Sequence, residues 1–170
     1  MIQPYQPMDV DVLHPASTFH AVMTGDLLTL GWHGGQIVQF AGGFNPITVS
    51  RSDGNAVAGF LQRGSAEANT DWTNMQVLES MSPHVMKVTH DNGIFSFRYF
   101  ETMDATFRAT GVGFPLVYAA NAELYVSENG YLTCDIPADL IAQSGIASPI
   151  LVGHAIAAVS GGRLPVQYQF

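Results

Sequence analysis

The residues of this sequence best suited to metal binding are six histidines and one cysteine. Paired histidine ligands usually stand at i, i+2 or i, i+4, so that one strand or one helical turn presents both rings to the same ion. No two histidines here have that spacing, and Cys134 is the only thiol. The sequence therefore predicts neither a metal nor another cofactor. The histidines are His14, His20, His33, His84, His90 and His154.

Nucleophilic and acid–base chemistry has no recognisable pattern either. A reactive cysteine needs a partner base and an electropositive setting, whereas Cys134 falls in an expected strand and is better interpreted as a small buried side chain. The chain has no Gly-x-Ser-x-Gly elbow, no phosphate-binding loop and no dinucleotide-binding glycine pattern. We therefore predict a protein without catalytic residues. The acidic residues expected in the arm and in turns are Asp9, Asp11, Asp53, Glu101 and Asp104.

The charge balance limits the partners of this chain. Charged residues make up 12% of the sequence, about half of the usual ~25%. Six basic residues stand against fourteen acidic ones, so the clustered cations that bind phosphate backbones are missing and nucleic acid is not an expected partner. No apolar run reaches the ~18 residues that span a bilayer, and no secretory signal is present, which favours synthesis in a cytoplasm.

The last third of the chain predicts a β module. Asn129-Gly130 separates two β-prone runs, the strongest short-range signal for a hairpin. From Leu164 to Phe170 apolar residues alternate with other residues, as in a half-buried strand. We expect this closing strand to lie inside a sheet. The expected strands are residues 115–119, 122–134, 150–159 and 164–170, with a turn at Gly161-Gly162 and one or two helical turns over 136–143.

The first two thirds predict further short strands. Glycine pairs at 34–35 and 42–43 mark turns, and Asp53-Gly54 and Asn92-Gly93 indicate hairpins. The Asn92-Gly93 turn would pair residues 85–90 with 94–100. Residues 65–83 are the best candidate for an insertion, either one short helix or a loop. The remaining expected strands are residues 19–23, 27–30, 36–40, 46–50 and 56–61.

Residues 1–18 predict an extended N-terminal arm, because three prolines interrupt any helical period. The arm is too apolar for a solvated tail, so it packs either on its own domain or on a neighbouring subunit. Buried aromatic and apolar anchors dominate many interfaces, which makes the arm residues and the two tryptophans our candidates for contacts. These candidate interface residues are Ile2, Tyr5, Met8, Val10, Leu13, Trp32 and Trp72.

Two stretches of the chain follow a similar order of strand, Val-Ser, turn glycine and small-residue strand. They cover residues 36–61 and 115–157. Two such units can pack as a sandwich or close into a barrel, although any all-β chain repeats short phrases of this kind. We expect an all-β fold, an antiparallel β-sandwich or small barrel, with a single domain over 19–170.

The terminal module resembles the decoration, or structural cement, proteins of tailed bacteriophage capsids. The resemblance is based on Val126-Ser-x-Asn-Gly130, the small-residue strand 152–158, the turn at Gly161-Gly162 and the closing strand, with counterparts at 36–40, 53–54 and 58–61. It implies a non-enzymatic virion protein on the outer capsid surface, where it binds the lattice of major capsid protein and stabilises the head. It also implies self-association, most often as a homotrimer. The long segment 65–113 departs from a minimal cement protein.

Three alternatives stay open at this stage. The chain can be another phage virion component, such as a tail or head–tail protein, since segment 65–113 has no counterpart in a cement protein. It can be a carbohydrate-binding β-sandwich module that stacks sugars on an exposed aromatic ring. It can be a hydrolase whose acid pair sequence alone does not locate.

Overall fold

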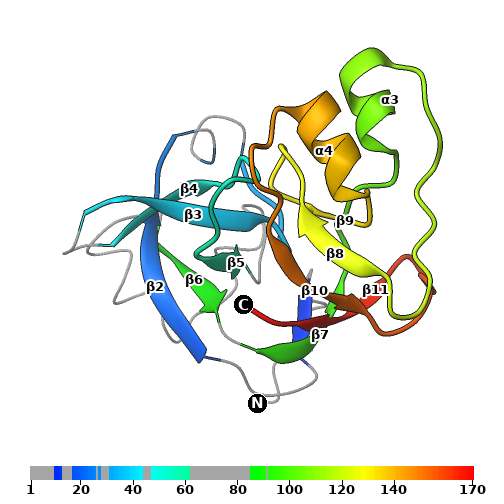
Figure 1. Ribbon diagram of the computed structural model, residues 1–170. Helices are drawn as coiled ribbons and strands as arrows, with labels where there is room; N and C mark the ends of the chain where they lie inside the picture. The colour runs from blue at the N-terminus through cyan, green and yellow to red at the C-terminus, as the bar shows by residue number, and fades with distance from the viewer. Residues whose placement is uncertain are drawn as a thin grey trace.

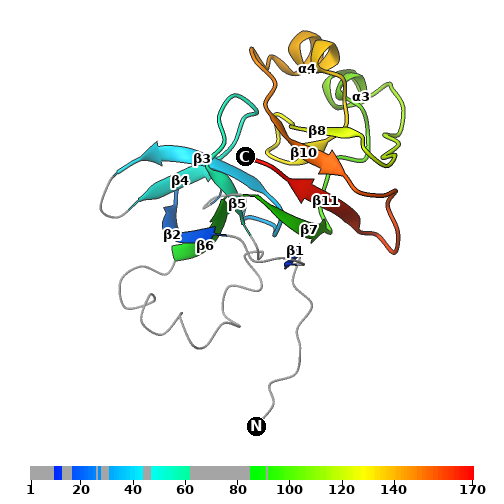
Figure 2. The ribbon, with the colours of Figure 1, turned by 60° about the horizontal axis from the view of Figure 1, so that its bottom comes forward.

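The computed structural model describes residues 10–12, 17–25, 27, 31–43, 47–61, 85–90 and 92–170. Two β modules lie side by side, and two short helices cover the second one (Figures 1 and 2). The helices are α3 (Ala105–Thr110) and α4 (Pro137–Ser144). The strands of the first half are β1 (Val10–Val12), β2 (Ser17–Met23), β3 (Ile37–Gly42), β4 (Thr48–Arg51), β5 (Gly59–Leu61) and β6 (Val85–His90). Those of the second half are β7 (Gly93–Phe97), β8 (Glu123–Val126), β9 (Leu132–Thr133), β10 (Leu151–Ala155) and β11 (Leu164–Tyr168).

Strands β2 to β6 form a closed barrel, which we call the N-terminal module. Around the barrel the strands follow the order β2-β4-β3-β5-β6. All neighbours are antiparallel except β2 and β4, which close the barrel in parallel. The predicted all-β class is confirmed, and a small barrel is one of the two architectures that we expected.

Strands β7 to β11 form the C-terminal module, a curved sheet in which β7 and β9 do not pair to close a barrel. The order is β7-β11-β10-β8-β9, and β1 adds a sixth strand beside β7. The segment after β7 is joined to β9 by one backbone hydrogen bond, which Glu101 N donates to Leu132 O at 2.9 Å. The barrel has a corresponding hydrogen bond between the segment after β2 and β4, in which Thr24 N donates to Val49 O. The second module is therefore a nearly closed version of the first.

The two modules are copies of one topology. Replacing β2, β3, β4, β5 and β6 by β7, β8, β9, β10 and β11 converts one strand order into the other. The ladder registers agree as well, since Val88 pairs with Phe19 in the barrel and Val166 pairs with Phe95 in the sheet. The predicted internal repeat is thus present at the level of strand order and register, and it extends beyond the stretches that we expected. In the predicted alignment residues 47–50 matched 124–127, whereas the ladders match β3 with β8.

One glycine marks the same position in each module. Gly59 of β5 has φ +152°, and Gly153 of β10 has φ +157°. A Cβ on Gly59 would collide with the carbonyl oxygen of Thr89 and lie 2.8 Å from Val88. A Cβ on Gly153 would collide with the carbonyl oxygen of Gln167 on the next strand. Both glycines therefore allow a close approach of two strands that no side chain permits.

The inner faces of the modules are apolar and correspond residue by residue. The register aligns the buried Val38 with Leu124, and Val49 with Leu132. Each module buries its own apolar cluster, as the alternation of side chains along a strand requires. Other buried pairs at matching register positions are Leu61 with Ala155 and Val88 with Val166.

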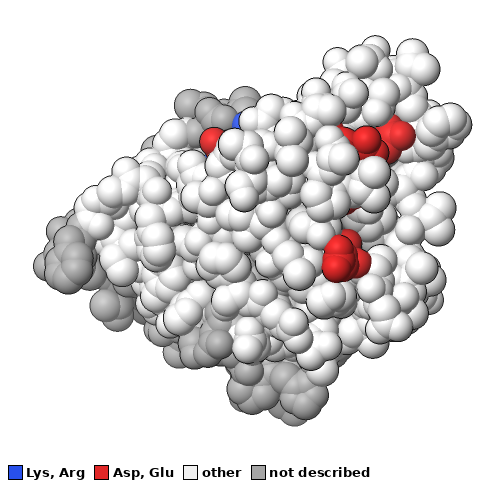
Figure 3. Space-filling view, in the orientation of Figure 1, with Lys and Arg blue, Asp and Glu red and all other residues white. Residues whose placement is uncertain are grey.

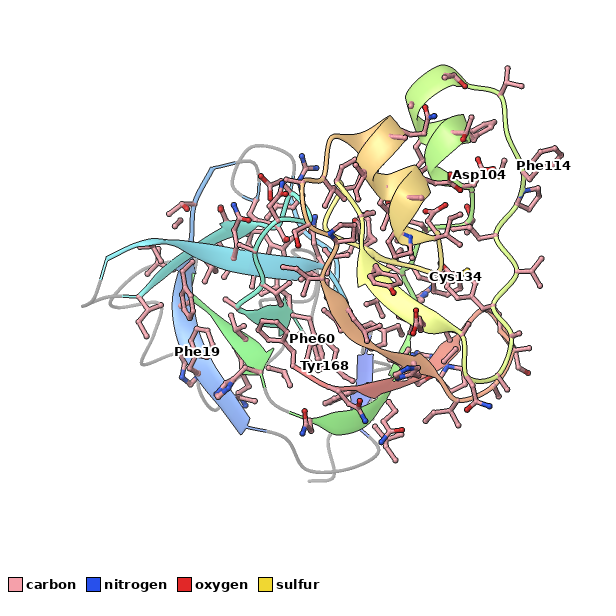
Figure 4. All side chains as sticks on the ribbon, viewed as in Figure 1. Phe19, Phe60, Asp104, Phe114, Cys134 and Tyr168 are labelled. Atoms are coloured by element: carbon pink, nitrogen blue, oxygen red, sulfur yellow. The ribbon has the colours of Figure 1, made fainter. Side chains whose placement is uncertain are left out.

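The junction between the modules is an aromatic cluster. Phe60 of β5 points out of the barrel into the concave face of the C-terminal module (Figure 4). Its ring centroid lies 4.8 Å from that of Phe95, 5.0 Å from Phe97 and 5.1 Å from Tyr168, in edge-to-face geometry. All four side chains are buried, so this cluster packs the outer face of the barrel against the core of the C-terminal module.

Two predictions about local pairing are wrong. Asn92-Gly93 does not close a hairpin, because β6 pairs in the barrel with β2 and β5 while β7 pairs with β1 and β11. The chain crosses between modules there. Likewise Asp53-Gly54 does not join paired strands, since β4 and β5 both flank β3. Residues 115–119 form no strand, because only Pro115 makes an isolated bridge, with Met103.

Other predictions are confirmed. β8 and β9 form the hairpin around Asn129-Gly130, although Ser127 to Tyr131 make the turn rather than two residues. The closing strand β11 lies between β7 and β10, with Leu164, Val166 and Tyr168 buried. α4 forms where helical turns were expected, with Pro137 at its start and Gly145 at its end.

The arm and the insertion fall largely outside the described residues. Within the predicted arm, β1 pairs antiparallel with β7, and β2 already begins at Ser17. The described residues do not include the insertion predicted at 65–83 or the strand predicted at 27–30, apart from Leu27, which is buried. The boundary between residues 18 and 19 and the single domain over 19–170 stay predictions.

Candidate interaction surface

An exposed apolar surface covers the outer side of the C-terminal module. The loop after α3 carries Val112, Phe114 and Val117, which are 76%, 77% and 82% exposed. Figure 4 shows Phe114 pointing away from the body of the protein. No Asp, Glu, Lys or Arg occurs between Arg108 and Glu123. We call this surface the apolar cap, and it consists of Phe107, Val112, Phe114 and Val117.

The backbone beneath the apolar cap is fixed by one carboxylate. Asp104 caps α3, because its Oδ1 accepts a hydrogen bond from Phe107 N at 2.8 Å. Its Oδ2 accepts from Phe114 N at 3.0 Å, and its own amide donates to Phe114 O at 2.9 Å. Leu116 N also donates to Thr102 O at 2.9 Å. The exposed rings therefore project from a loop whose path is held on both sides.

The loop also packs closely against α3. A Cβ on Gly113 would collide with Asp104 and lie 2.8 Å from Cβ of Phe107. Tyr118 anchors the far end, because its buried hydroxyl donates to Glu101 O at 2.6 Å. Burial raises the pKa of this phenol, helped by the charges of nearby Cys134, Glu101 and Asp135, so it stays protonated and remains a donor.

A buried ion cluster connects α3 to the β8–β9 hairpin. Arg108, in the last turn of α3, donates from Nε to Glu128 Oε1 at 2.8 Å and from Nη2 to Glu128 Oε2 at 3.2 Å. Its Nη1 lies 2.9 Å from Asp135 Oδ2 and donates to Met103 O at 2.6 Å. The side chains of Arg108 and Asp135 are only 8% and 2% exposed. A forked guanidinium suits this bidentate arrangement.

The electrostatics of the cluster follow from burial and pairing. Burial alone lowers the pKa of Arg108, but the hydrogen bond to Glu128 and the charges of Glu101, Glu128 and Asp135 outweigh it and raise the pKa overall. Burial alone raises the pKa of Glu128, yet its bonds with Arg108 lower the pKa overall. Both partners are therefore held in their charged forms.

Neighbouring polar groups complete the cluster. Asp135 Oδ1 accepts from Ala105 N at 2.9 Å, and its Oδ2 accepts from Thr133 Oγ1 at 2.5 Å. Glu101 Oε1 accepts from Ser127 Oγ at 2.7 Å and from Asn129 Nδ2 at 3.1 Å. Every carboxylate of the cluster has partners within the chain, so the arrangement is typical of a structural latch rather than of a substrate site.

Two observations on the described residues concern metal binding and thiol chemistry. Among those residues no group of three His, Cys, Asp or Glu side chains is placed to hold a metal ion. The half-buried Cys134 lies with its Sγ 3.7 Å from Val117 O, and burial raises the pKa of its thiol to about 11. A thiol with that pKa is a poor nucleophile near neutral pH. Of the described helices, none has the length and apolar character needed to cross a membrane.

The predicted interface residues are only partly within the described chain. Trp32 is 7% exposed and lies in the core of the barrel, and Val10 lies in β1 beside β7. The other predicted interface residues, Ile2, Tyr5, Met8, Leu13 and Trp72, lie outside the described residues. The role of all seven in an interface stays a prediction.

Sequence reasoning missed the apolar cap. The signal was the charge-free run between Arg108 and Glu123, which holds several large apolar residues without a strand period. The Asp104-x-x-Phe107 spacing of an N-cap, followed by Gly111 at the helix end, would have located α3.

Comparison with known proteins identifies no family for this chain. No protein-family model matches it, and no curated protein sequence matches it. Among solved structures, it is similar to the head fiber gp8.5 N base of bacteriophage phi29. The TM-score is 0.44 at 10% sequence identity, over 91% of this chain and 95% of that chain. A likeness at this level carries no conclusion about the activity or partners of this chain.

Proposed function

We propose that this chain is a non-enzymatic structural protein of a phage virion, a decoration protein that binds the outer surface of the assembled major capsid lattice and stabilises the head. The observation that supports it most is the apolar cap, in which large exposed side chains project from a loop held by Asp104. A preorganised apolar anchor loses little conformational entropy on binding, which favours docking to another protein.

The surface chemistry supports the same proposal. On the face shown in Figure 3 charged side chains are sparse, and the visible acidic ones gather mainly around α3, α4 and β8. With a net charge of −8 and few cations, the chain suits a protein partner better than a nucleic acid. The sequence resemblance to capsid decoration proteins implies the location, and it implies a homotrimer.

The test is co-sedimentation with purified expanded heads that lack this chain. Replacing Val112, Phe114 and Val117 together by serine removes the apolar cap from an exposed loop and leaves both cores intact. We expect occupancy to fall at least about tenfold, because anchor residues of this kind contribute more than ~1 kcal/mol each. The matched control is Val159→Ser, an exposed apolar residue of the β10–β11 hairpin, which should bind normally. Unchanged occupancy of the triple variant would rule out the apolar cap as the anchor.

Two further experiments separate the alternatives. Deleting residues 1–18 should weaken binding to heads if the arm clasps the lattice, and normal occupancy would show that it does not. A carbohydrate-binding module is the second candidate, because the ring of Phe40 is 62% exposed and stacks on Phe19 at 5.8 Å. A glycan-array signal that disappears in Phe40→Ala would favour that module over a virion protein.

A further inference from the structure

One end of the barrel is lined by aromatic rings that the chain leaves partly exposed. Phe19 of β2, Phe40 of β3 and His90 of β6 occupy inward-facing positions, as their register with the buried Val88 and Val49 shows. The ring of Phe19 lies 5.8 Å from that of Phe40 and 5.4 Å from that of His90. We call these three residues the aromatic mouth, and Figure 4 shows Phe19 there, at the barrel end away from the helices.

The same positions exist in the C-terminal module, where they are completely buried. The shared register matches Phe19 with Phe95, and Phe40 with Val126. His90 matches Tyr168, because each lies two residues after the matched pair Val88 and Val166. Phe95, Val126 and Tyr168 are all 0% exposed, whereas Phe40 is 62% exposed.

The difference has one visible cause. The mouth of the C-terminal module is filled by the outer face of the barrel, which inserts Phe60 and Ile37. Phe60 makes edge-to-face contacts with Phe95 and Tyr168, at 4.8 and 5.1 Å between ring centroids. Phe60 belongs to β5, so the filling group is an aromatic side chain presented by an extended segment. Among the described residues, none fills the barrel mouth in this way.

We propose that the aromatic mouth binds an uncharged, extended segment of another protein that inserts an aromatic side chain between Phe19, Phe40 and His90. The repeat indicates which side chain the mouth would take, because the same architecture in the C-terminal module accepts a phenylalanine from a strand. The mouth residues include no Asp, Glu, Lys or Arg, so a charged segment gains nothing there. Edge-to-face contacts between the rings would contribute binding energy in addition to that from the apolar area that the insertion buries.

Within the residues that the structure describes, the C-terminal module of a second copy does not offer the matching surface. The positions of the C-terminal module that correspond to Phe60 and Ile37 are His154 and Glu123, which pair with each other across β10 and β8. These side chains are polar, and Glu123 is exposed and accepts a hydrogen bond from Tyr125. The two described positions that would continue the stack are therefore polar, so a second copy does not fill the mouth in the way that β5 fills the C-terminal module, and we assign the occupant to a different protein. The inference does not depend on the capsid proposal.

The experiment titrates isotope-labelled full-length protein with an uncharged, end-capped peptide of the β5 sequence, residues 56–62, and follows the ring signals by NMR. This peptide contains the segment that fills the equivalent mouth in the C-terminal module. We expect saturable shifts at Phe19, Phe40 and His90. Binding should weaken about tenfold or more when the peptide carries Phe60→Ala, or when the protein carries Phe40→Ala. The control Phe114→Ala removes an exposed ring elsewhere and should bind normally.

Several results would overturn the inference. Equal shifts with both peptides, or shifts outside the mouth, would show binding that does not use an inserted ring. Absence of shifts at millimolar peptide would show that no such segment binds. Nuclear Overhauser contacts from the three rings to residues 62–84 would show that the chain fills its own mouth. Shifts produced by sugars and not by the peptide would assign the mouth to a carbohydrate.

Discussion

Removing the cation from the buried ion cluster is the sharpest perturbation of the fold. In Arg108→Met the side chain keeps its length and apolar stem but loses the guanidinium. Glu128 then loses two hydrogen bonds, and the carboxylate of Asp135, which is 2% exposed, loses its only counter-charge at hydrogen-bond distance among the described residues. The substitution thus removes the ion pairs that connect α3 to the β8–β9 hairpin.

The magnitude follows from burial. Breaking a buried ion pair by removing one partner typically costs about 3–5 kcal/mol, since an uncompensated charge remains. Asp135 keeps its bonds from Ala105 N and Thr133 Oγ1, which partly compensate its charge. Glu128 is 26% exposed and regains some water. We therefore expect the free energy of unfolding to fall by about 3 kcal/mol at neutral pH.

The assay is urea unfolding between pH 7 and pH 3. The pKa of Glu128 is lowered in the folded protein, so its pairing stabilises the fold above the unfolded pKa of ~4.3 and is lost as the pH falls through the lower folded value. The variant lacks that pairing. The difference between wild type and Arg108→Met should thus be full at pH 7 and shrink below about pH 4.

The control is Arg98→Met, in which the lost guanidinium is exposed and lies 5.8 Å from the centre of the Tyr99 ring. An exposed cation of this kind contributes about 1 kcal/mol or less. A loss below about 1 kcal/mol in Arg108→Met, or a loss that does not change with pH, would refute the interpretation of the cluster as a charged latch.

Three other predictions test the repeat and the buried groups. Gly59→Ala and Gly153→Ala should each destabilise the protein by more than ~2 kcal/mol in thermal or urea unfolding, because both side chains meet a neighbouring strand; a tolerated alanine at either site would contradict the matched close approach. Cys134 should react with a disulfide reagent at pH 8 much more slowly than a free thiol and accelerate toward pH 11, since burial raises its pKa to about 11; rapid reaction at pH 7 would disprove its burial. Tyr118→Phe should lower the free energy of unfolding by about 1–2 kcal/mol through loss of its hydroxyl hydrogen bond to a backbone carbonyl, and an unchanged value would show that this bond is not formed.

Local patterns predicted the elements better than their partners. The alternation of Leu164, Val166 and Tyr168 located β11 and its buried face, because a strand that is covered on one side needs apolar residues at every second position. Asn129-Gly130 located a true hairpin. Asn92-Gly93 has the same local pattern, yet the strands on its two sides enter different modules.

Long-range packing decides what local sequence cannot. β7 pairs with β11, and this pairing places Phe95 and Phe97 on the concave face that receives Phe60. No property of residues 85–100 alone indicates that choice. The apolar cap was hidden for a related reason, since its loop is held by Asp104 and Gly113 through contacts that produce no strand or helix period.

The measurement that tests the proposed function most directly is a low-resolution cryo-EM map of the native particle, combined with mass spectrometry of its proteins. We expect the chain in purified virions, as ordered density on the outer surface of the head with the apolar cap facing the capsid lattice. Absence of the chain from the particles, or density confined to the tail or to the interior of the head, would contradict the proposal.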